Sequence, residues 1–259
     1  MQPDSSVLAA AAWPEVAAGR HEVAVLPWGA TEAHNRHLPY GTDTIQAGAV
    51  TEAACRIAFE AGAPVVALPP VPFGVNTGQL DIPLCLNMMP STQAAVLRDV
   101  IRSVEAAGVG KLVLVNGHGG NDFRQMIREL QPVTQVFLCT LNWYAVVDPR
   151  PWFDHPGDHA GELETSVMLH LRPDLVHLER AGPGVTRPFA VAALREGWAW
   201  APRQWTRVTD DTGVGDPGPA TAEKGRAYFD AVTRKIAGFL VELAAADRER
   251  MYEPEVRPG

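Results

Sequence analysis

A short segment near the start of the chain concentrates side chains of the kinds that bind metal ions. Between Gly29 and Asp43 the sequence places Glu32, His34 and His37, and Asp43 itself closes the segment. Carboxylate oxygens and imidazole nitrogens are the donors that divalent ions such as zinc or manganese accept. The alternative is a polar turn in which the histidines and acids pair with one another. The ligand types favour a metal site, with Glu32, His34 and Asp43 as its first candidates.

A glycine-rich turn carries a further candidate ligand. Asn116-Gly-His-Gly-Gly-Asn121 follows the apolar run Lys111–Val115. Its glycines allow a sharp turn and a close approach of substrate or metal, while His118 points outward. The turn lacks the Lys and Ser/Thr of a P-loop and has the wrong spacing for a dinucleotide fingerprint. We interpret His118 as a metal ligand, and the alternative is a structural turn with an incidental histidine.

The segment Asp158–Ser166 combines a histidine, two glutamates and two hydroxyls at an expected helix start. If that helix begins by His159, then His159 and Glu162 share one of its faces. The helix dipole favours an anionic group at this end. The alternative is a capping arrangement in which the acids only stabilise the first turn. We favour function, with His159 and Glu162 as catalytic candidates, and expect Glu164 to face away from Glu162 and to bond to protein.

Nucleophilic catalysis by serine or cysteine has little support. The chain contains no Gly-x-Ser-x-Gly elbow. Cys55, Cys85 and Cys139 lie far apart in apolar stretches, without the electropositive or helix-start setting that lowers a thiol pKa. Such thiols are expected to be buried and reduced, and not part of a disulfide framework or a thiolate metal site. This pattern fits a reducing cytoplasm.

The overall composition is that of an ordinary globular protein. Its 259 residues are 46% hydrophobic and 20% charged, so we expect one domain over residues 1–259, with a frayed tail after about residue 252. The net charge of −8 and the scattered arginines argue against a nucleic-acid partner and favour a small-molecule substrate. The early apolar run Leu8–Trp13 follows no basic residue and is too short to span a membrane, so we expect a cytoplasmic protein.

Apolar strand-like runs alternate with helical patterns along the chain. The expected strands are Val23–Pro27, Pro64–Leu68, Lys111–Val115 and Thr134–Thr140. The expected helices are Thr44–Gly62, Ser91–Ala107 opened by a Ser91 cap, Asp122–Leu130, and Ala220 to about Ala245. This alternation predicts an α/β fold with a mostly parallel central sheet and helices on both faces. In such sheets, sites collect beyond the carboxyl ends of the strands, where both ligand-rich segments lie.

Three irregular segments interrupt this alternation, namely Pro69–Pro90, Trp143–Asp158 and Gly182–Pro219. Loops of this length in a compact domain are usually functional or form contacts between subunits. Four aromatic residues of the second segment are candidates for pocket walls, with a role in the core or at a subunit contact left open. They are Trp143, Tyr144, Trp152 and Phe153.

Taken together, the three motifs resemble those of the creatininase (creatinine amidohydrolase) family. The family pattern Gly-x-x-Glu-x-His-x-x-His-Leu-Pro-x-x-Thr-Asp corresponds to Gly29–Asp43. Its Asn-Gly-His turn corresponds to Asn116–Asn121, and its helix start with Glu-Thr-Ser to His159–Ser166. The resemblance extends in order over most of residues 22–225, and three spaced motifs in one order are a specific signal.

The resemblance implies a three-layer α/β/α fold that assembles into hexamers and binds two divalent metal ions. Zinc is the first choice for these ions, with manganese or iron as alternatives. Carried over by position, Glu32 and His118 would hold one metal and His34 the other. Asp43 would bridge both metals, and His159 would handle protons near the substrate.

One position departs from the family pattern. Creatininase itself has a carboxylate two residues after the histidine of the Asn-Gly-His turn, where this chain has Gly120. The second metal therefore needs a replacement ligand, and Glu162 is our candidate for that role or for a base. This departure puts the specific creatininase activity in doubt.

The function implied by the resemblance is hydrolysis of an amide-type C–N bond, cyclic or non-peptide, in a small molecule. The alternatives are opening of a C–C bond in a cyclic polyol ketone, or a peptidase-like or formamide-cleaving activity. A different class of alternative is an oligomeric metal-binding or sugar-binding protein without catalysis. The intact set of acids and histidines argues against this last reading.

Overall fold

Four parallel strands form the central sheet, in the order β2-β1-β3-β4. The computed structural model describes residues 5–252, so the tail expected to fray lies outside the described residues. The strands are β1 (Val23–Trp28), β2 (Val65–Ala67), β3 (Lys111–Asn116) and β4 (Phe137–Asn142). β1 and β3 pair in register from Val23 opposite Lys111 to Trp28 opposite Asn116. Both strands are buried along their whole length, which explains why they read as continuous apolar runs.

Helices of very different length surround the sheet. The α-helices are α1 (Trp13–Ala18), α2 (Thr42–Glu60), α3 (Pro90–Ala106), α4 (Phe123–Leu130), α5 (Glu162–Leu171), α6 (Ala192–Arg195), α7 (Trp205–Val208) and α8 (Ala222–Ala245). Short 3₁₀ turns occupy Leu8–Ala10, Thr77–Gln79, Gln131–Val133, Trp143–Ala145, Pro173–Leu175, Leu178–Arg180 and Arg248–Arg250. The longest helices alternate with the strands, as the sequence predicted.

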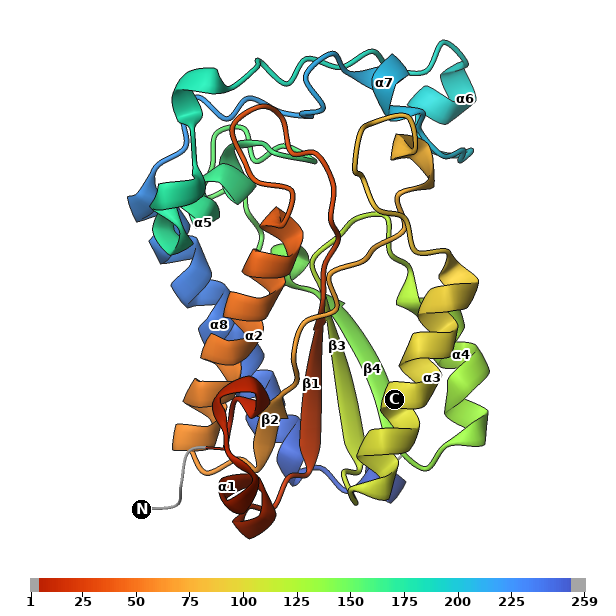
Figure 1. Ribbon diagram of the computed structural model, residues 1–259, viewed down its shortest axis with the longest axis vertical. Helices are drawn as coiled ribbons and strands as arrows, with labels where there is room; N and C mark the ends of the chain where they lie inside the picture. The colour runs from red at the N-terminus through yellow and green to blue at the C-terminus, as the bar shows by residue number, and fades with distance from the viewer. Residues whose placement is uncertain (1–4, 253–259) are drawn as a thin grey trace, which may run out of the picture.

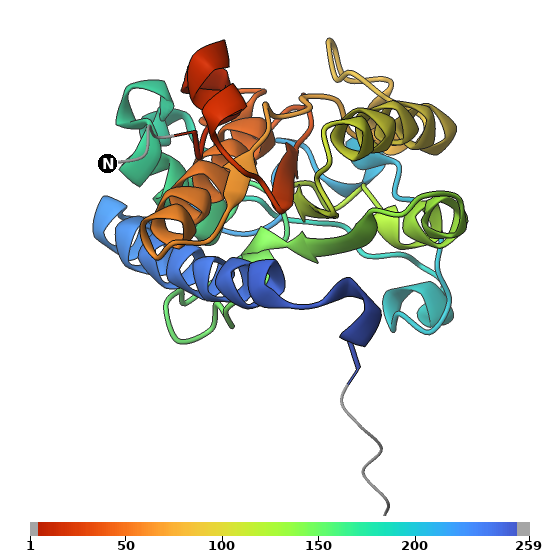
Figure 2. The ribbon, with the colours of Figure 1, turned by 90° about the horizontal axis from the view of Figure 1, so that it is seen from below.

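The helices form layers on the two faces of the sheet (Figures 1 and 2). On one face, Val25 and Val113 belong to a core cluster that also contains residues of α2, α5 and α8. On the other, Leu26 and Leu114 pack in a second cluster with residues of α3 and α4. Successive strand residues point to opposite faces, so each strand contributes to both clusters. The predicted three-layer α/β/α architecture is confirmed.

The start of α3 differs from the prediction. The helix begins at Pro90, and its N-cap is Met89, which makes no side-chain capping hydrogen bond. Proline suits the first helical position because its fixed φ matches the helix and its missing N–H would have had no partner there. Ser91 is therefore a residue of the first turn and not the cap.

The aromatic residues predicted as candidate pocket walls lie elsewhere. Trp143 and Phe153 are 0% and 3% exposed and belong to the core cluster beneath α8. Their rings lie against Tyr228, whose hydroxyl donates to the backbone oxygen of Tyr144. This segment anchors α8, in agreement with the alternative of a core role.

The carboxyl ends of the strands face the irregular part of the chain, at the top of Figure 1. The loop between β1 and α2 lies there, together with the turn after β3 and the segment that carries α6 and α7. Within residues 5–252, none of the helices combines the length and the apolar character needed to cross a bilayer.

Candidate metal centre

The loop after β1 brings three of the predicted ligands inside the protein. Glu32, His34 and Asp43 are each 1% exposed. Asp43 lies in the first turn of α2, where the helix dipole favours a carboxylate. Glu32 and His34 precede the helix and are fixed by the bond from Glu32 N to the Tyr40 oxygen and by the bridge between His34 and Leu38. A short loop after a buried strand therefore presents three donors to one point.

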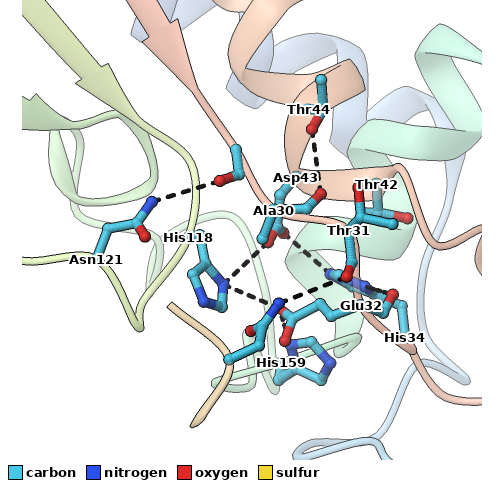
Figure 3. A network of polar contacts seen from close by, with 12 residues as sticks. Ala30, Thr31, Glu32, His34, Thr42, Asp43, Thr44, His118, Asn121 and His159 are labelled. Carbon is cyan, nitrogen blue, oxygen red and sulfur yellow. Dashed lines mark hydrogen bonds and ion pairs between the residues drawn. The ribbon is translucent and has the colours of Figure 1, made fainter. Parts of the chain in front are cut away.

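His118 joins these residues from the turn after β3. Asn116 holds this turn, because its side chain accepts from His118 N and donates to the His118 oxygen. The His118 Nε2 atom donates to the Val75 oxygen at 3.0 Å, which leaves Nδ1 facing the two carboxylates. Nδ1 lies 2.9 Å from Glu32 Oε1 and 3.1 Å from Asp43 Oδ2. Figure 3 shows both contacts.

The two oxygens of Asp43 face different histidines. Oδ1 lies 3.0 Å from His34 Nε2, while Oδ2 faces His118. His34 is oriented by its other ring nitrogen, which donates to the Glu32 backbone oxygen at 3.1 Å. Ligand atoms of Glu32, Asp43 and His118 all lie within 4.8 Å of one another, and so do those of His34, Asp43 and Glu164. A third such group contains Glu32, His34 and His159, so Asp43 belongs to two of the three groups.

His159 lies beside the cluster and borders the cavity. Its backbone pairs with Val214, and its Nε2 donates to the Ala33 oxygen at 2.8 Å. The free Nδ1 atom is 3.7 Å from Glu32 Oε1, and the ring centroid is 4.1 Å from that of His34. Because α5 begins at Glu162, His159 precedes the helix and does not share a helical face with Glu162. The condition for a shared face, a helix that begins by His159, is not met.

The electrostatics of the cluster are those of a buried cation site. Burial disfavours a charged His34, but the Asp43 carboxylate outweighs it and raises the pKa of His34 to about 10. The pKa of His118 is raised in the same way, with burial opposed chiefly by Glu32. Burial raises the pKa of Glu164 to about 7. Without an added cation, the imidazoles have to hold protons to balance the carboxylates.

These residues fit a pair of divalent ions. The carboxylates of Glu32, Asp43 and Glu164 and the imidazoles of His34 and His118 form a nitrogen and oxygen donor set that zinc and manganese accept. The buried Oδ2 atom of Asp43 receives no well-formed hydrogen bond from the described residues, although His118 is close to it. A buried acceptor without a hydrogen bond lowers the stability of the folded protein, and a bound metal ion would supply the missing partner.

Comparison with known proteins agrees with this arrangement. Residues 9–240 match the family model for creatininase, described as creatinine amidohydrolase. The chain belongs to the creatininase family. The proteins of this family to which it is similar are hydrolases, and so is this chain.

Two curated relatives of this creatininase-family hydrolase bear different names. A mycofactocin precursor peptide peptidase of Mycobacterium ulcerans (strain Agy99) is 31% identical over 226 residues, which are 84% of this chain and 80% of the relative. A creatinine amidohydrolase of Pseudomonas putida is 30% identical over 245 residues, which are 85% of this chain and 89% of the relative. The substrates named for these two relatives differ.

Solved structures share the fold. A Bacteroides fragilis NCTC 9343 protein with a provisional assignment as creatinine amidohydrolase is 41% identical, with a TM-score of 0.91. The match covers 97% of this chain and 100% of that one. A creatininase structure named for manganese and a variant of Zn-Zn type have TM-scores of 0.74 and 0.73, at 25% and 26% identity. Each covers 94% of this chain and 100% of its own.

Glu162 does not join the metal cluster of this creatininase-family chain. Its carboxylate is fully buried and forms an ion pair with Lys224 of α8, and it accepts from His155 N at 2.7 Å. Glu164 lies in the cluster instead, where Ala160 N donates to its Oε2. Two helical residues span about 200° of rotation, so the two glutamates face opposite sides of α5. We therefore correct the ligand assignment from Glu162 to Glu164.

Gly120 leaves no room for the carboxylate that creatininase itself carries at this point of the turn. A Cβ atom at this position would lie 2.3 Å from the Val75 oxygen and 2.4 Å from His118 Nε2. Both distances are far below van der Waals contact. A side chain at residue 120 would therefore require the Val75 oxygen or the His118 ring to shift.

Two more polar residues complete the surroundings of the cluster. His37 Nε2 lies 2.8 Å from Thr165 Oγ1, and burial lowers the pKa of His37 to about 4. It is a neutral contact to α5 and not a member of the ligand groups. Gln79 donates to Glu32 Oε2 from the Pro69–Pro90 loop. Gln79 was not predicted, because it lies in a loop without hydrophobic periodicity.

A cavity of about 440 Å³ leads to the cluster. Glu32, His118 and His159 line it, and the ring of Trp205 in α7 meets the His159 ring edge to face at a centroid distance of 5.3 Å. The rest of the wall comes from two loops, with Val75–Gln79 on one side and Phe189–Trp205 contributing several residues on the other. The size suits a small molecule or the end of a short chain. The first and third irregular segments therefore supply most of the wall, and Asp158 is the residue of the second segment that lines the cavity within the described part of the chain.

Proposed function

We propose that this creatininase-family hydrolase is a binuclear metalloenzyme that cleaves an amide-type C–N bond of a small molecule. The observation that carries the proposal is the double contact of Asp43, whose two oxygens serve two separate donor groups. A carboxylate shared in this way suits two neighbouring ions. The ligands of one ion would be Glu32, His118 and Asp43, and those of the other His34, Glu164 and Asp43.

The bound ions would lower the pKa of a water molecule towards neutrality and polarise a carbonyl group. Nitrogen and oxygen donors in a closed site make zinc our first choice, with manganese or iron as alternatives. The Mn and Zn-Zn forms named for related creatininase structures support this choice.

His159 supplies the proton transfer that amide cleavage needs. Its Nε2 donates to the Ala33 oxygen, so the proton of the neutral ring is on that atom and Nδ1 is free to accept another. Burial, followed by the charge of His34, lowers the pKa of His159 below its ordinary value. A neutral imidazole that lines the cavity can take a proton at Nδ1 and pass it to a leaving nitrogen.

A short peptide is the second candidate substrate. The 31% identity to a mycofactocin precursor peptide peptidase supports it, and that relative covers most of the chain. A peptide and a small amide use the same bond chemistry at the cluster. They differ in how much of the substrate the cavity walls contact.

The correction from Glu162 to Glu164 makes a direct prediction. Glu164→Gln removes a negatively charged ligand, so the affinity for the second equivalent of zinc falls by at least about 10- to 100-fold. Glu162→Gln keeps both equivalents, because that side chain binds Lys224 and His155 N. It lowers the free energy of unfolding by about 1–3 kcal/mol through its weakened buried contacts. Metal analysis after dialysis measures the zinc content of both variants, and thermal unfolding measures the stability of Glu162→Gln. Equal metal loss in both variants contradicts the assignment of Glu164 as the ligand.

Removal of the metal tests the proposed function as a whole. Treatment with a chelator abolishes the release of amine or ammonia from a panel of small amides and short peptides, and added zinc or manganese restores it. Activity that survives complete metal removal, verified by elemental analysis, would contradict the proposal. An open-chain acid formed without any amine would instead indicate cleavage of a carbon-carbon bond.

A further inference from the structure

Arg203 is the one arginine or lysine among the described residues that line the cavity. Its Nη1 atom donates at 2.6 Å to Oδ2 of Asp158, which also lines the cavity. The side chains of Arg203 and Asp158 are 39% and 58% exposed, so this pair is open to solvent and contributes little to stability. An arginine fork has five N–H donors, and Asp158 occupies only one end of it. The remaining donors are available to a ligand.

The position of Arg203 is fixed from several sides. A Cβ atom at Gly78 would lie 2.0 Å from the Arg203 oxygen, so the two backbones pack directly against each other. Thr206, three residues on, donates to Asp81 at 2.5 Å. The guanidinium carbon is 4.5 Å from the centroid of the Trp205 ring, within the range of a cation–π contact. A rigid backbone and an aromatic platform place the cation at the cavity wall.

Trp205 also connects Arg203 to the cluster. Its ring meets His159 edge to face at a centroid distance of 5.3 Å, and its Nε1 donates to the Thr212 oxygen. One aromatic ring therefore separates the cation from the residue that we assign to proton transfer. A group bound by Arg203 lies within the same cavity as a carbonyl placed at the cluster.

We propose that Arg203 binds a carboxylate group of the substrate, so that the substrate is an amide with a negatively charged end. Asp158 holds the guanidinium in the absence of substrate and gives way to the incoming carboxylate. Guanidinium and carboxylate match in shape and charge, which gives specificity as well as affinity. This inference rests on the proposed amide hydrolysis and names the class of amide.

A purely structural role makes a different prediction. If the pair only ties the α6–α7 segment to the loop before α5, then loss of either partner loosens the same wall. Arg203→Gln and Asp158→Asn would then change binding in the same direction. In our proposal the two variants have opposite effects, because Asp158 competes with the substrate for Arg203.

The test uses two probes that differ only in charge, N-benzoylglycine and N-benzoylglycinamide, titrated into the zinc-loaded protein by calorimetry. Arg203→Gln weakens binding of N-benzoylglycine by about 10- to 100-fold, and leaves N-benzoylglycinamide unchanged. Asp158→Asn strengthens binding of N-benzoylglycine and leaves the neutral probe unchanged. The control is Arg207→Gln, an exposed arginine of α7 outside the cavity lining, which changes neither.

Two results would overturn the inference. If Arg203→Gln binds N-benzoylglycine with unchanged affinity, the carboxylate of the probe binds elsewhere, for example at the metal ions. If Arg203→Gln and Asp158→Asn both weaken binding, the ion pair has only a structural role. Failure of the proposed function is a separate result: no amide releases amine, while the charged probe still binds through Arg203.

Discussion

Asp43→Ala abolishes both metal binding and turnover. The variant retains less than one equivalent of zinc after dialysis, because Asp43 donates one oxygen to each ligand group. Turnover of the best amide substrate falls by about a thousandfold or more, since loss of both ions removes roughly 4 kcal/mol of transition-state stabilisation. Elemental analysis and an amine-release assay on the same sample measure the two effects.

Asp211→Asn is the matched control for this variant. Asp211 is also a buried carboxylate, but its oxygens accept from Gly184 N, Gly213 N and the Thr209 hydroxyl. Its loss lowers the unfolding temperature and leaves two equivalents of metal in place. An Asp43→Ala protein that keeps two equivalents would contradict the bridging role.

His159→Ala keeps both metal equivalents and loses turnover. His159 makes its fixed hydrogen bond to the Ala33 oxygen and presents Nδ1 to the cavity side of Glu32. Removal of a positioned proton-transfer group lowers kcat by about 10²- to 10⁴-fold. Metal analysis and steady-state kinetics over a range of pH values measure the result, and the limb of the profile that belongs to His159 disappears.

His155→Ala is the control for His159→Ala. His155 lies on the same loop, is exposed, and contacts Glu162 only through its backbone N–H. We expect unchanged turnover and metal content for this variant. Unchanged turnover in His159→Ala would remove that residue from the mechanism, and loss of one metal equivalent would make it a ligand.

The layers and much of the candidate metal-binding cluster were predictable from the sequence. Strands that are buried on both faces appear in a sequence as nearly continuous apolar runs, and β1 (Val23–Trp28) and β3 (Lys111–Asn116) are two such strands. Because parallel strands end at one edge of the sheet, the sequence predicted that His34 and His118 lie at the same edge, and both contact Asp43. Their distances to Asp43 follow from that arrangement.

The residues that were missed depend on how a helix is rotated about its axis or on the path of an irregular loop. The choice between Glu162 and Glu164 depends on where α5 begins and on the helix that packs beside it, and sequence spacing fixes neither. Gln79 and Arg203 approach the cavity from loops that have no periodicity to read. The aromatic residues from Trp143 onward turned to the core because α8 covers them. The single domain, the hexamer and the cytoplasmic location stay predictions.

The register of β1 and β3 has a consequence for folding. Trp28 lies opposite Asn116, so the donors that follow each strand meet only when this non-local pairing is complete. A nascent chain that ends before residue 111 already contains Glu32, His34 and Asp43, yet it lacks His118 from the turn after β3 and Glu164 from α5. In the binuclear site that we propose, tight ion binding therefore comes late in folding and stabilises the finished sheet over any partly assembled chain.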